Sequence, residues 1–285
     1  MSDAIAGALY VVATPIGNLE DLSSRATRVL GEVALIAAED TRHSARLLRH
    51  LGLSVPMLSL HEYNELARIE QLDARLLAGE SIALISDAGT PLISDPGFVL
   101  VRELRARGRR IIPIPGPCAL VAALSAAGLP TDRFLFQGFL PARSAGRRAR
   151  LGALADREET LVFYESPHRI HDTLADLAVT LKERQLVLAR ELTKTFETFL
   201  DGTAPELLAC MHADPDQARG EFVIMVAGAV PRDGEGAASF EANALLSALF
   251  KEGVGVKQAA AVASRVLGGA KKGWYARIQT LKDGD

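Results

Sequence analysis

The 285-residue sequence contains few cysteines and few aromatic residues. Its two cysteines, Cys118 and Cys210, are too few for a disulfide framework and do not have the spacing of metal ligands. This excludes a small disulfide-stabilised domain and a cysteine-based metal centre, and a reducing, cytoplasmic setting is expected. Only 5% of the residues are aromatic, so the cores are expected to be built mainly from aliphatic side chains.

Long apolar runs are also missing. No uninterrupted stretch reaches about 18 residues, the length needed to span a bilayer. The N-terminal segment MSDAIAGALYVVATP carries an acid where a secretion signal carries basic residues. The sequence therefore predicts a soluble protein with no secretion signal and no membrane partner.

Acidic and basic residues are nearly balanced in number. The formal net charge is −3, which gives the chain no overall attraction to nucleic acid. Basic residues nevertheless cluster in RARGRR, residues 105–110, and in ARSAGRRAR, residues 142–150. A polyanionic partner is therefore expected to meet a local patch.

Short apolar runs alternate with amphipathic segments along most of the chain, a pattern typical of α/β proteins. The first group predicts strands near 8–13, 33–37, 81–86 and 110–114, separated by helices near 22–31, 41–51, 65–78 and 96–107. The second group predicts strands near 134–138, 160–164, 186–190 and 221–227, separated by helices near 145–156, 167–181 and 203–212. We expect two α/β domains, residues 1–117 and 118–230, and a linker with a helical tail over residues 231–285.

Glycine- and proline-rich loops follow the strands of the first group: ATPIGNLEDL at 13–22, AAEDTR at 37–42, SDAGTP at 86–91 and PGPCA at 115–119. Ligands of open α/β sheets bind beyond the carboxyl ends of the strands, so these loops predict a small-molecule pocket. The GxGxxG and GxxxxGK[ST] fingerprints are absent, which excludes the usual dinucleotide and P-loop sites. A second Ser-Asp turn, 94–97, predicts Asp95 as the N-cap of the next helix with Pro96 at its first position.

Two charged segments follow strands of the second group. YESPHR, residues 164–169, predicts Ser166 as a helix N-cap, with His168 and Arg169 in the first turn. RELTKTFETF, residues 190–199, gathers four charged side chains. Each segment fits either a solvated surface or the second side of the pocket, and both readings stay open from the residues alone.

The ordered set ATPIGNLEDL, EDTR, SDAGTPLISDPG, IPGP, FQGFLP, YESPHR, RELTKTFE and GEFV, residues 13–223, resembles the family of ribosomal RNA small subunit methyltransferase I, in the tetrapyrrole-methylase superfamily. The resemblance implies S-adenosylmethionine-dependent methylation of the ribose 2′-oxygen of a cytidine in the decoding region of 16S, small-subunit ribosomal RNA. It also implies two α/β domains of tetrapyrrole-methylase type with a cofactor cleft between them, and a homodimer. The substrate is the ribosomal RNA or the assembled 30S subunit, and the sequence does not distinguish them.

The resemblance implies a cofactor site in the loops of the first half. The predicted S-adenosylmethionine-binding residues are Pro15, Gly17, Asn18, Ser86, Asp87, Ala88, Gly89, Thr90, Pro115, Gly116, Pro117 and Cys118. Asp87 is expected to pair with the ammonium group of the cofactor. The second turn, Ser94 to Gly97, is expected to start the helix that braces the first. Cys118 stands where the family usually has serine, so a hydroxyl hydrogen bond would be lost there.

Methyl transfer to a ribose hydroxyl requires alignment of the reacting atoms and gains from a positioned base. The predicted catalytic residues, all from the second half, are Glu165, His168, Arg169, Glu191, Lys194 and Glu197. The three acids and His168 are candidate bases that the sequence does not rank. Arg169, Arg190 and Lys194 are candidates for holding phosphates or a developing oxyanion. No metal site is predicted.

Two other functions fit the same residues. One is methylation of a tetrapyrrole ring carbon, the other chemistry of the superfamily. The second is a non-catalytic, RNA-binding ribosome-assembly factor. The tail, with two helices near 256–282 separated by Gly268-Gly269, carries Lys271, Lys272 and Trp274 and fits either RNA binding or packing.

Overall fold

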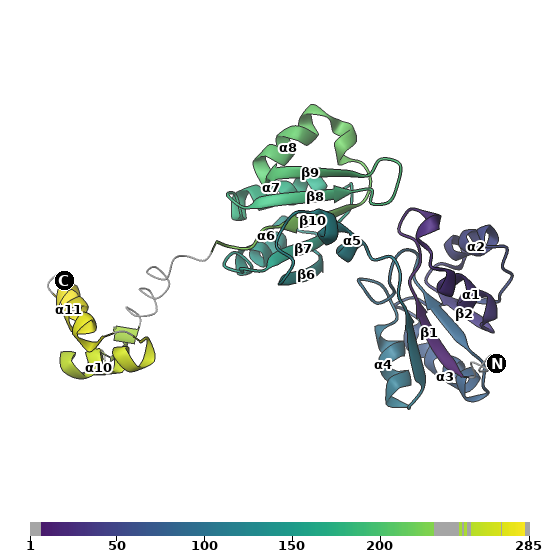
Figure 1. Cartoon of the computed structure of the whole chain (residues 1–285), viewed down its shortest axis with the longest axis horizontal. Helices are drawn as coiled ribbons and strands as arrows, with labels where there is room; N and C mark the ends of the chain where they lie inside the picture. The colour runs from purple at the N-terminus through teal and green to yellow at the C-terminus, as the bar shows by residue number, and fades with distance from the viewer. Residues whose placement is uncertain (1–6, 231–244, 247, 250–251, 269, 283–285) are drawn as a thin grey trace. The chain divides into compact units, whose positions relative to one another are not determined.

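The computed structural model describes residues 7–230, 245–246, 248–249, 252–268 and 270–282 (Figure 1). The chain divides into two compact units, Met1–Ala229 and Val230–Asp285, and both α/β sheets lie in the first. Within the described ranges, no helix has the length and apolar character that crossing a membrane would require.

The first sheet has five parallel strands in the order β3-β2-β4-β1-β5. These are β1 Ala8–Val12, β2 Leu35–Ala38, β3 Met57–Ser59, β4 Ile82–Ile85 and β5 Arg110–Ile114. The four helices that connect them are α1 Ser24–Glu32, α2 Thr41–His50, α3 Glu65–Leu77 and α4 Phe98–Ala106. Apolar residues of α1 and α2 pack in one core cluster and those of α3 and α4 in another. Both faces of the sheet are therefore covered, as a parallel sheet requires.

The loops at the carboxyl edge of this sheet are joined to one another. Thr14, after β1, and Gly89, after β4, exchange two backbone hydrogen bonds of 2.9 and 3.0 Å. The hydroxyl of Thr90 donates to the carbonyl oxygen of Pro117, after β5, at 2.9 Å. Three of the loops that the sequence singles out thus form one connected surface.

The second sheet is mixed, with the strand order β6-β7-β10-β8-β9. Its strands are β6 Phe134–Phe139, β7 Thr160–Glu165, β8 Gln185–Arg190, β9 Thr198–Thr203 and β10 Phe222–Val226. Strand β10 is antiparallel to β7 and to β8, so Glu165, Phe222 and Arg190 lie in register at one edge. The predicted core strand at 221–227 is confirmed, since every residue of β10 is buried.

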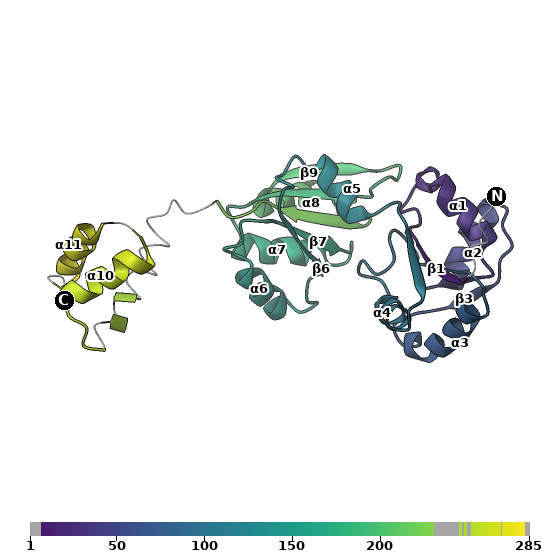
Figure 2. The ribbon, with the colours of Figure 1, turned by 60° about the horizontal axis from the view of Figure 1, so that its bottom comes forward.

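Helices cover both faces of the second sheet (Figures 1 and 2). They are α5 Ala119–Ala126, α6 Ser144–Ala153, α7 Ile170–Thr180 and α8 Ala204–Ala213. Leucines of α6, α7 and α8 share one core cluster, and α5 packs on the opposite face against Val162, Val187 and Val223. The segment 114–130, which connects the two sheets, thus contains a helix that packs on the second sheet.

Two predicted helix starts are wrong. Helix α4 begins at Phe98 after Gly97, not at Asp95, and the carboxylate of buried Glu65, on α3, accepts the Leu100 N–H at 2.5 Å. A side chain from another helix therefore occupies a free N–H of the first turn of α4. Helix α7 begins at Ile170, because a turn over residues 166–169 precedes it and the Arg169 N–H donates to the Ser166 carbonyl oxygen.

The basic segment 142–150 forms α6, and one of its arginines is buried. The Nε of Arg147 donates to Oδ2 of Asp176, on α7, at 2.7 Å, and each side chain is only 3% exposed. Ser144 Oγ and Arg148 Nε donate to the other carboxylate oxygen at 2.8 and 2.5 Å. The positive charge of Arg147 is therefore used inside the protein, and it is not available to a polyanion.

The described residues of the second unit include two helices, α10 Val256–Val266 and α11 Lys271–Lys282. Ala259, Ala263 and Ile278 are fully buried between them. Trp274 packs against this small core, and its Nε1 donates to the Gly268 carbonyl oxygen at 2.7 Å. Packing thus accounts for the position of the Trp274 side chain, whereas the side chains of Lys271 and Lys272 are exposed. The linker expected after Gly228 falls mainly on residues 231–244, outside the described residues.

Candidate functional site

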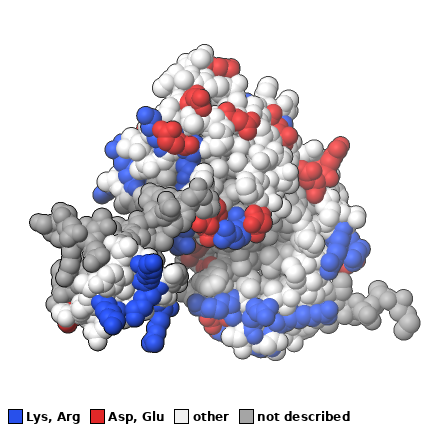
Figure 3. Space-filling view, turned by 60° about the vertical axis from the view of Figure 1, so that its left-hand side comes forward, with Lys and Arg blue, Asp and Glu red and all other residues white. Residues whose placement is uncertain are grey.

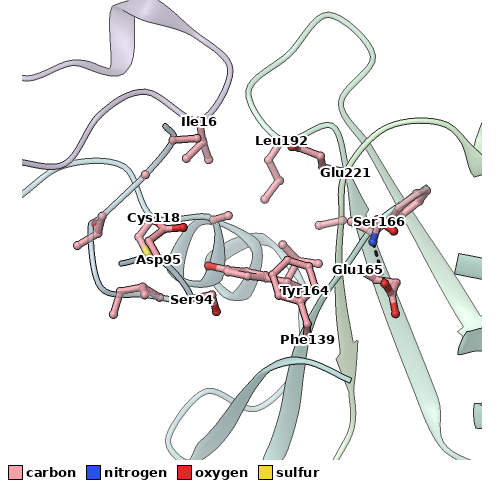
Figure 4. Close-up of a pocket in the computed structure, with 18 residues that line it drawn as sticks. Ile16, Ser94, Asp95, Cys118, Phe139, Tyr164, Glu165, Ser166, Leu192 and Glu221 are labelled. Atoms are coloured by element: carbon pink, nitrogen blue, oxygen red, sulfur yellow. Dashed lines mark hydrogen bonds between the residues drawn. The ribbon is translucent and has the colours of Figure 1, made fainter. Parts of the chain in front are cut away.

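A cavity of about 250 Å³ lies where the strand-end loops of the two sheets meet (Figure 4). It is lined by residues from both halves of the first unit: Ile16, Ala88, Gly89, Thr90, Ile93, Ser94, Asp95, Cys118, Ala119, Phe139, Tyr164, Glu165, Ser166, Ala189, Leu192, Glu221, Phe222 and Val223. Most of these side chains are apolar or small, and a few polar groups converge among them. Such a lining is typical of a small-molecule site.

The charged residues of this lining are all acids. Asp95, Glu165 and Glu221 contribute carboxyl groups, and the lining contains no lysine, arginine or histidine. A ligand with positive charge and an apolar ring suits such a cavity better than a phosphate-bearing nucleotide does. S-adenosylmethionine has this chemistry, because it carries an ammonium, a sulfonium and an adenine ring. The residues present therefore fit the predicted cofactor.

The structure brings four of the predicted cofactor residues into this cavity: Ala88, Gly89, Thr90 and Cys118. Pro15, Ser86 and Asp87 instead line a second cavity of about 150 Å³, together with His43 and Arg46 of α2. The Asp87 carboxylate accepts the Asp40 N–H at 3.1 Å, which ties the loop after β4 to the loop after β2. The pairing of Asp87 with the ammonium group of the cofactor stays a prediction.

The remaining predicted cofactor residues support the loops. Gly116 lies against Ala13, so that a Cβ there would come within 3.1 Å of the Ala13 side chain, and Pro115 and Pro117 flank it. The Asn18 N–H donates to Oγ1 of Thr193 at 3.1 Å. The loop after β1 thus contacts the loop after β8, and the binding roles predicted for Gly17, Asn18 and residues 115–117 are not tested by these contacts.

Gly17 is the closest point of that contact, and we expect Gly17→Ala to lower the free energy of unfolding by about 1–3 kcal/mol. An added Cβ would overlap Cγ of Lys194 and lie 3.0 Å from the Leu192 carbonyl oxygen, so the loop after β8 would have to move. Urea denaturation measures the change. Gly152→Ala, on α6 with open space around it, is the matched control and is expected to be neutral or stabilising by up to about 1 kcal/mol. Equal stability of the two variants would contradict the contact.

Glu165 lines the cavity, but its carboxylate is fully engaged. The side chain is 0% exposed, Oε1 accepts the Ser166 N–H at 2.9 Å and lies 3.3 Å from Nε of Arg169, and Oε2 accepts the Thr173 hydroxyl at 2.7 Å. Arg169 in turn donates to the Leu140 carbonyl oxygen at 2.6 Å. These contacts hold β7, the turn after it and α7 together, which suits a positioning residue better than a base.

Glu191 and Lys194 form a charged cluster beside the cavity. Lys194 Nζ donates to Glu191 Oε1 at 2.8 Å and to Glu221 Oε2 at 2.9 Å, and Glu191 Oε1 also accepts the Glu221 N–H at 2.9 Å. Burial alone would raise the pKa of Glu191, but the hydrogen bonds from Lys194 and from the Glu221 N–H hold that pKa below its usual value. An acid whose ionised form is stabilised in this way is a weak base.

The other second-half candidates do not line the cavity. His168 is exposed, and Glu197 accepts the Thr193 N–H at 2.6 Å. Arg190 is only 7% exposed, and its guanidinium donates to the carbonyl oxygens of Asp216 and Phe196. The predicted contact of Arg190 with phosphate is therefore wrong, because its place at the end of β8 turns the side chain inward. The catalytic roles of the other predicted residues stay predictions.

The backbone is strained on both sides of the cavity. In the part of the chain that the structure describes, the only residues other than glycine with positive φ are Leu92 and Ser94, after β4, and Glu191 and Thr193, after β8. Each such conformation costs roughly 1–2 kcal/mol, and strain of this kind concentrates at functional sites. Ser94 and Leu192, which line the cavity, lie within these two loops.

Sequence reasoning misses two polar groups that line the cavity, the carboxyl group of Asp95 and the hydroxyl group of Tyr164, which lie near the predicted residue Cys118 (Figure 4). The Tyr164 hydroxyl accepts the Leu120 N–H at 3.1 Å, and Tyr164 and Cys118 pack against the same core cluster. Burial raises the pKa of Asp95 to about 6, against a hydrogen bond from Ser86 and with help from the charges of Glu39 and Asp87. The expectation that the second Ser-Asp turn only braces the first is therefore wrong, since Ser94 and Asp95 line the cavity themselves.

Comparison with known proteins identifies the class. The family model of the tetrapyrrole (corrin/porphyrin) methylases matches residues 8–208, and a model described as the RsmI C-terminal HTH domain matches residues 236–282. The chain belongs to the tetrapyrrole methylase family, a family of methyltransferases. Solved structures show the same fold: the uroporphyrin-III-C-methyltransferase of Thermus thermophilus has a TM-score of 0.55 at 23% identity, covering 78% of this chain and 94% of that one. Cobalt precorrin-4 methyltransferase has a TM-score of 0.60 at 15% identity, covering 80% and 97%.

Relatives with higher sequence identity share one name. The chain is 55% identical over 271 residues to ribosomal RNA small subunit methyltransferase I of Pseudomonas aeruginosa, covering 95% of this chain and 96% of the relative. It is 49% identical over 276 residues to the Escherichia coli O157:H7 protein of the same name, covering 96% and 95%. The family resemblance of the motifs and the predicted fold class are confirmed.

Proposed function

We propose that this chain transfers the methyl group of S-adenosylmethionine to the ribose 2′-oxygen of a cytidine in the decoding region of small-subunit ribosomal RNA. The observation that carries the proposal is the cavity in which the motif loops of both sheets converge. The name shared by relatives that are 55% and 49% identical over nearly the whole chain supports the RNA substrate. The cytidine, the 2′-oxygen and the decoding region rest on the motif resemblance.

S-adenosylmethionine, when bound, supplies a methyl group on a cationic sulfur. Ala88, Gly89 and Thr90 form the wall of the cavity on the side of the first sheet, where their small side chains leave room for a ligand next to the backbone. The apolar side chains of Leu192 and Val223 exclude water on the opposite side. The sulfhydryl group of Cys118 keeps its contact with Tyr164, so the change from serine leaves the wall intact.

The RNA must be held by local cationic surfaces, because the chain as a whole is acidic. Figure 3 shows Lys and Arg side chains gathered in groups on one face rather than spread evenly. Helix α2, Thr41–His50, has no acidic residue, and its exposed positions are Arg42, His43, Arg46, Arg49 and His50. It starts at the carboxyl edge of the first sheet, directly after the loop that follows β2. We assign α2 to the phosphate backbone of the substrate.

Three further features belong to the same proposal. Domain boundaries at 117 and 230 separate the two sheets and the tail, and the cofactor lies between the sheets. A homodimer and a cytoplasmic location follow from the family resemblance. The naked RNA and the assembled 30S subunit are both candidate substrates.

A labelled-methyl experiment tests the proposed substrate class. The chain is incubated with methyl-labelled S-adenosylmethionine and with either unmodified small subunits or a reduced tetrapyrrole. Label in the ribosomal RNA is expected. Label in the tetrapyrrole alone would favour ring-carbon methylation, and binding of RNA without any transfer would favour the non-catalytic assembly factor.

A further inference from the structure

The turn after β4 holds Asp95 in a fixed position. Leu92 and Ser94 adopt left-handed conformations with φ of 73° and 70°, and Gly97 follows at 119°. A Cβ at Gly97 would lie 2.9 Å from the Leu84 side chain, so the turn is packed closely against β4. A strained turn of this kind persists only where its surroundings enforce it.

The far end of the turn is anchored as well. The buried carboxylate of Glu65 accepts the Leu100 N–H, which leaves the Asp95 side chain free of the capping role that its sequence position suggests. Asp95 instead lines the cavity, where it lies near Cys118 and Tyr164 (Figure 4). It also lines a neighbouring cavity, to which Glu39, His61, Glu62 and Glu65 contribute as well. The fold thus places Asp95 at the cavity and not at the start of α4.

Titratable groups from several elements surround Asp95. Glu39, after β2, and Asp87, after β4, add negative charge that raises the pKa of Asp95, and interaction with Ser86 acts on that pKa in the opposite direction. Tyr164, from β7, and Cys118, before α5, face it across the cavity. Together with burial, the two acids raise the pKa of Asp95 to about 6.

The other acids of the lining are already engaged. The oxygens of Glu165 accept the Ser166 N–H and the Thr173 hydroxyl beside Arg169, and Glu221 accepts from Lys194. Asp95 forms no ion pair with any described residue. Among the lining carboxyl groups it is the one that can take up a proton without breaking a salt bridge.

We propose that Asp95 is the catalytic base that accepts the proton of the ribose 2′-hydroxyl, an assignment that rests on the function proposed above. The ribose oxygen gives its proton to a carboxylate oxygen of Asp95 and forms a bond to the methyl carbon. The carbon–sulfur bond breaks, and its electron pair stays on sulfur, so that the sulfonium becomes a neutral thioether. Asp95, now a neutral carboxylic acid, returns the proton to water after the product leaves.

The sign of the pH dependence follows from the raised pKa. A base with a pKa of about 6 is ionised at neutral pH and accepts a proton more readily than an ordinary aspartate does. The rate of methyl transfer should therefore fall as the pH drops through about 6. The unfolded chain has an ordinary Asp pKa of about 3.9, so the contribution of Asp95 to stability is lost as the pH rises from there to about 6.

The test compares full-length Asp95→Asn with the parent, and Asp132→Asn, an exposed acid outside the cavity, is the matched control. Asparagine keeps the shape of the side chain but cannot accept the proton. For Asp95→Asn, kcat for methyl transfer to unmodified small subunits is expected to fall about 100-fold or more, and the acid limb of the rate profile disappears. Binding of S-adenosylhomocysteine, measured by calorimetry, should change by less than about threefold. Relative to the parent, the free energy of unfolding of the variant should rise between pH 4 and about 6, because the Asp95 contribution to the pH dependence is absent.

Three other results would each overturn the assignment of Asp95 as the catalytic base. A variant that keeps the parent rate shows that Asp95 is not the base. A variant whose rate loss comes with tenfold weaker S-adenosylhomocysteine binding shows that Asp95 holds the cofactor instead. A parent that transfers no methyl group to any form of the ribosomal RNA contradicts the proposed function, and the role of Asp95 falls with it.

Discussion

Replacing Asp176 with alanine is expected to lower the free energy of unfolding by about 3–5 kcal/mol, because the change leaves a buried charge without its partner. Arg147 is 3% exposed, and apart from Asp176 its guanidinium has only the Ala142 carbonyl oxygen, at 3.3 Å, as an acceptor among the described contacts. Asp176 also accepts from Ser144 and Arg148, so the variant removes these polar contacts between the neighbouring helices α6 and α7 (Figure 2). Urea denaturation followed by circular dichroism measures the loss.

The control for this variant is Asp172→Ala, an exposed acid in the first turn of the same helix. Its loss is expected to cost only about 0.3–1 kcal/mol through the helix dipole. Burial alone would raise the pKa of Asp176, but hydrogen bonds from Arg148, Ser144 and Arg147 hold it below its usual value. The stability that this group contributes is therefore present above about pH 3.9 and is lost as the pH falls through the lower folded pKa. A loss below 1 kcal/mol for Asp176→Ala, or an unchanged acid dependence, would contradict the buried ion pair.

The combined replacement of Arg42, Arg46 and Arg49 by alanine is expected to weaken binding to small-subunit ribosomal RNA about 10- to 100-fold at 0.1 M salt. Three exposed cations on α2 are removed, and each phosphate contact that is lost returns a bound counterion to the RNA. The slope of log affinity against log salt should become shallower by about 2 to 3. Filter binding over a series of salt concentrations measures both quantities, and S-adenosylhomocysteine binding should stay unchanged.

Arg102, Arg105 and Arg110 form the matched control. They are exposed arginines of α4 and β5, and α4 covers the opposite face of the sheet from α2. The control changes the net charge by the same amount, so it separates a general electrostatic effect from a specific surface. Equal losses in the two triple variants would mean that α2 is not the RNA-binding surface.

The sequence predicts the central strands of both sheets and one edge strand of each, β5 and β6, and it misses the other two edge strands, β3 and β9. Strands β2, β4 and β10 are buried throughout and therefore stand out as apolar runs. Strand β3 has three half-buried residues, and β9 has the mixed sequence TFLDGT, so neither stands out from its surroundings. Their pairing with β2 and β8 defines them as strands, and that pairing is tertiary information.

The candidate site was also predicted only in part. The loops after β1, β4 and β5 are predictable, because parallel strands bring their carboxyl ends to one edge. Asp95 is misread, because an Asp-Pro pair is a common helix start and only the contact between Glu65 and the Leu100 N–H shows that the cap comes from α3. Arg190 is misread because the sequence shows it only as one of four charged residues in a short segment. Its position in β8, in register with Phe222 of β10, buries the side chain, and that pairing is not visible in the sequence.

The position of the methyl group on ribosomal RNA tests the central claim most directly. Small subunits that lack the modification are incubated with the protein and S-adenosylmethionine, and nuclease fragments of the RNA are then mapped by mass spectrometry. The account predicts a single added methyl group, on the ribose 2′-oxygen of a cytidine in the decoding region. A methyl group on a base, on a nucleotide outside that region, or on no nucleotide at all would contradict it.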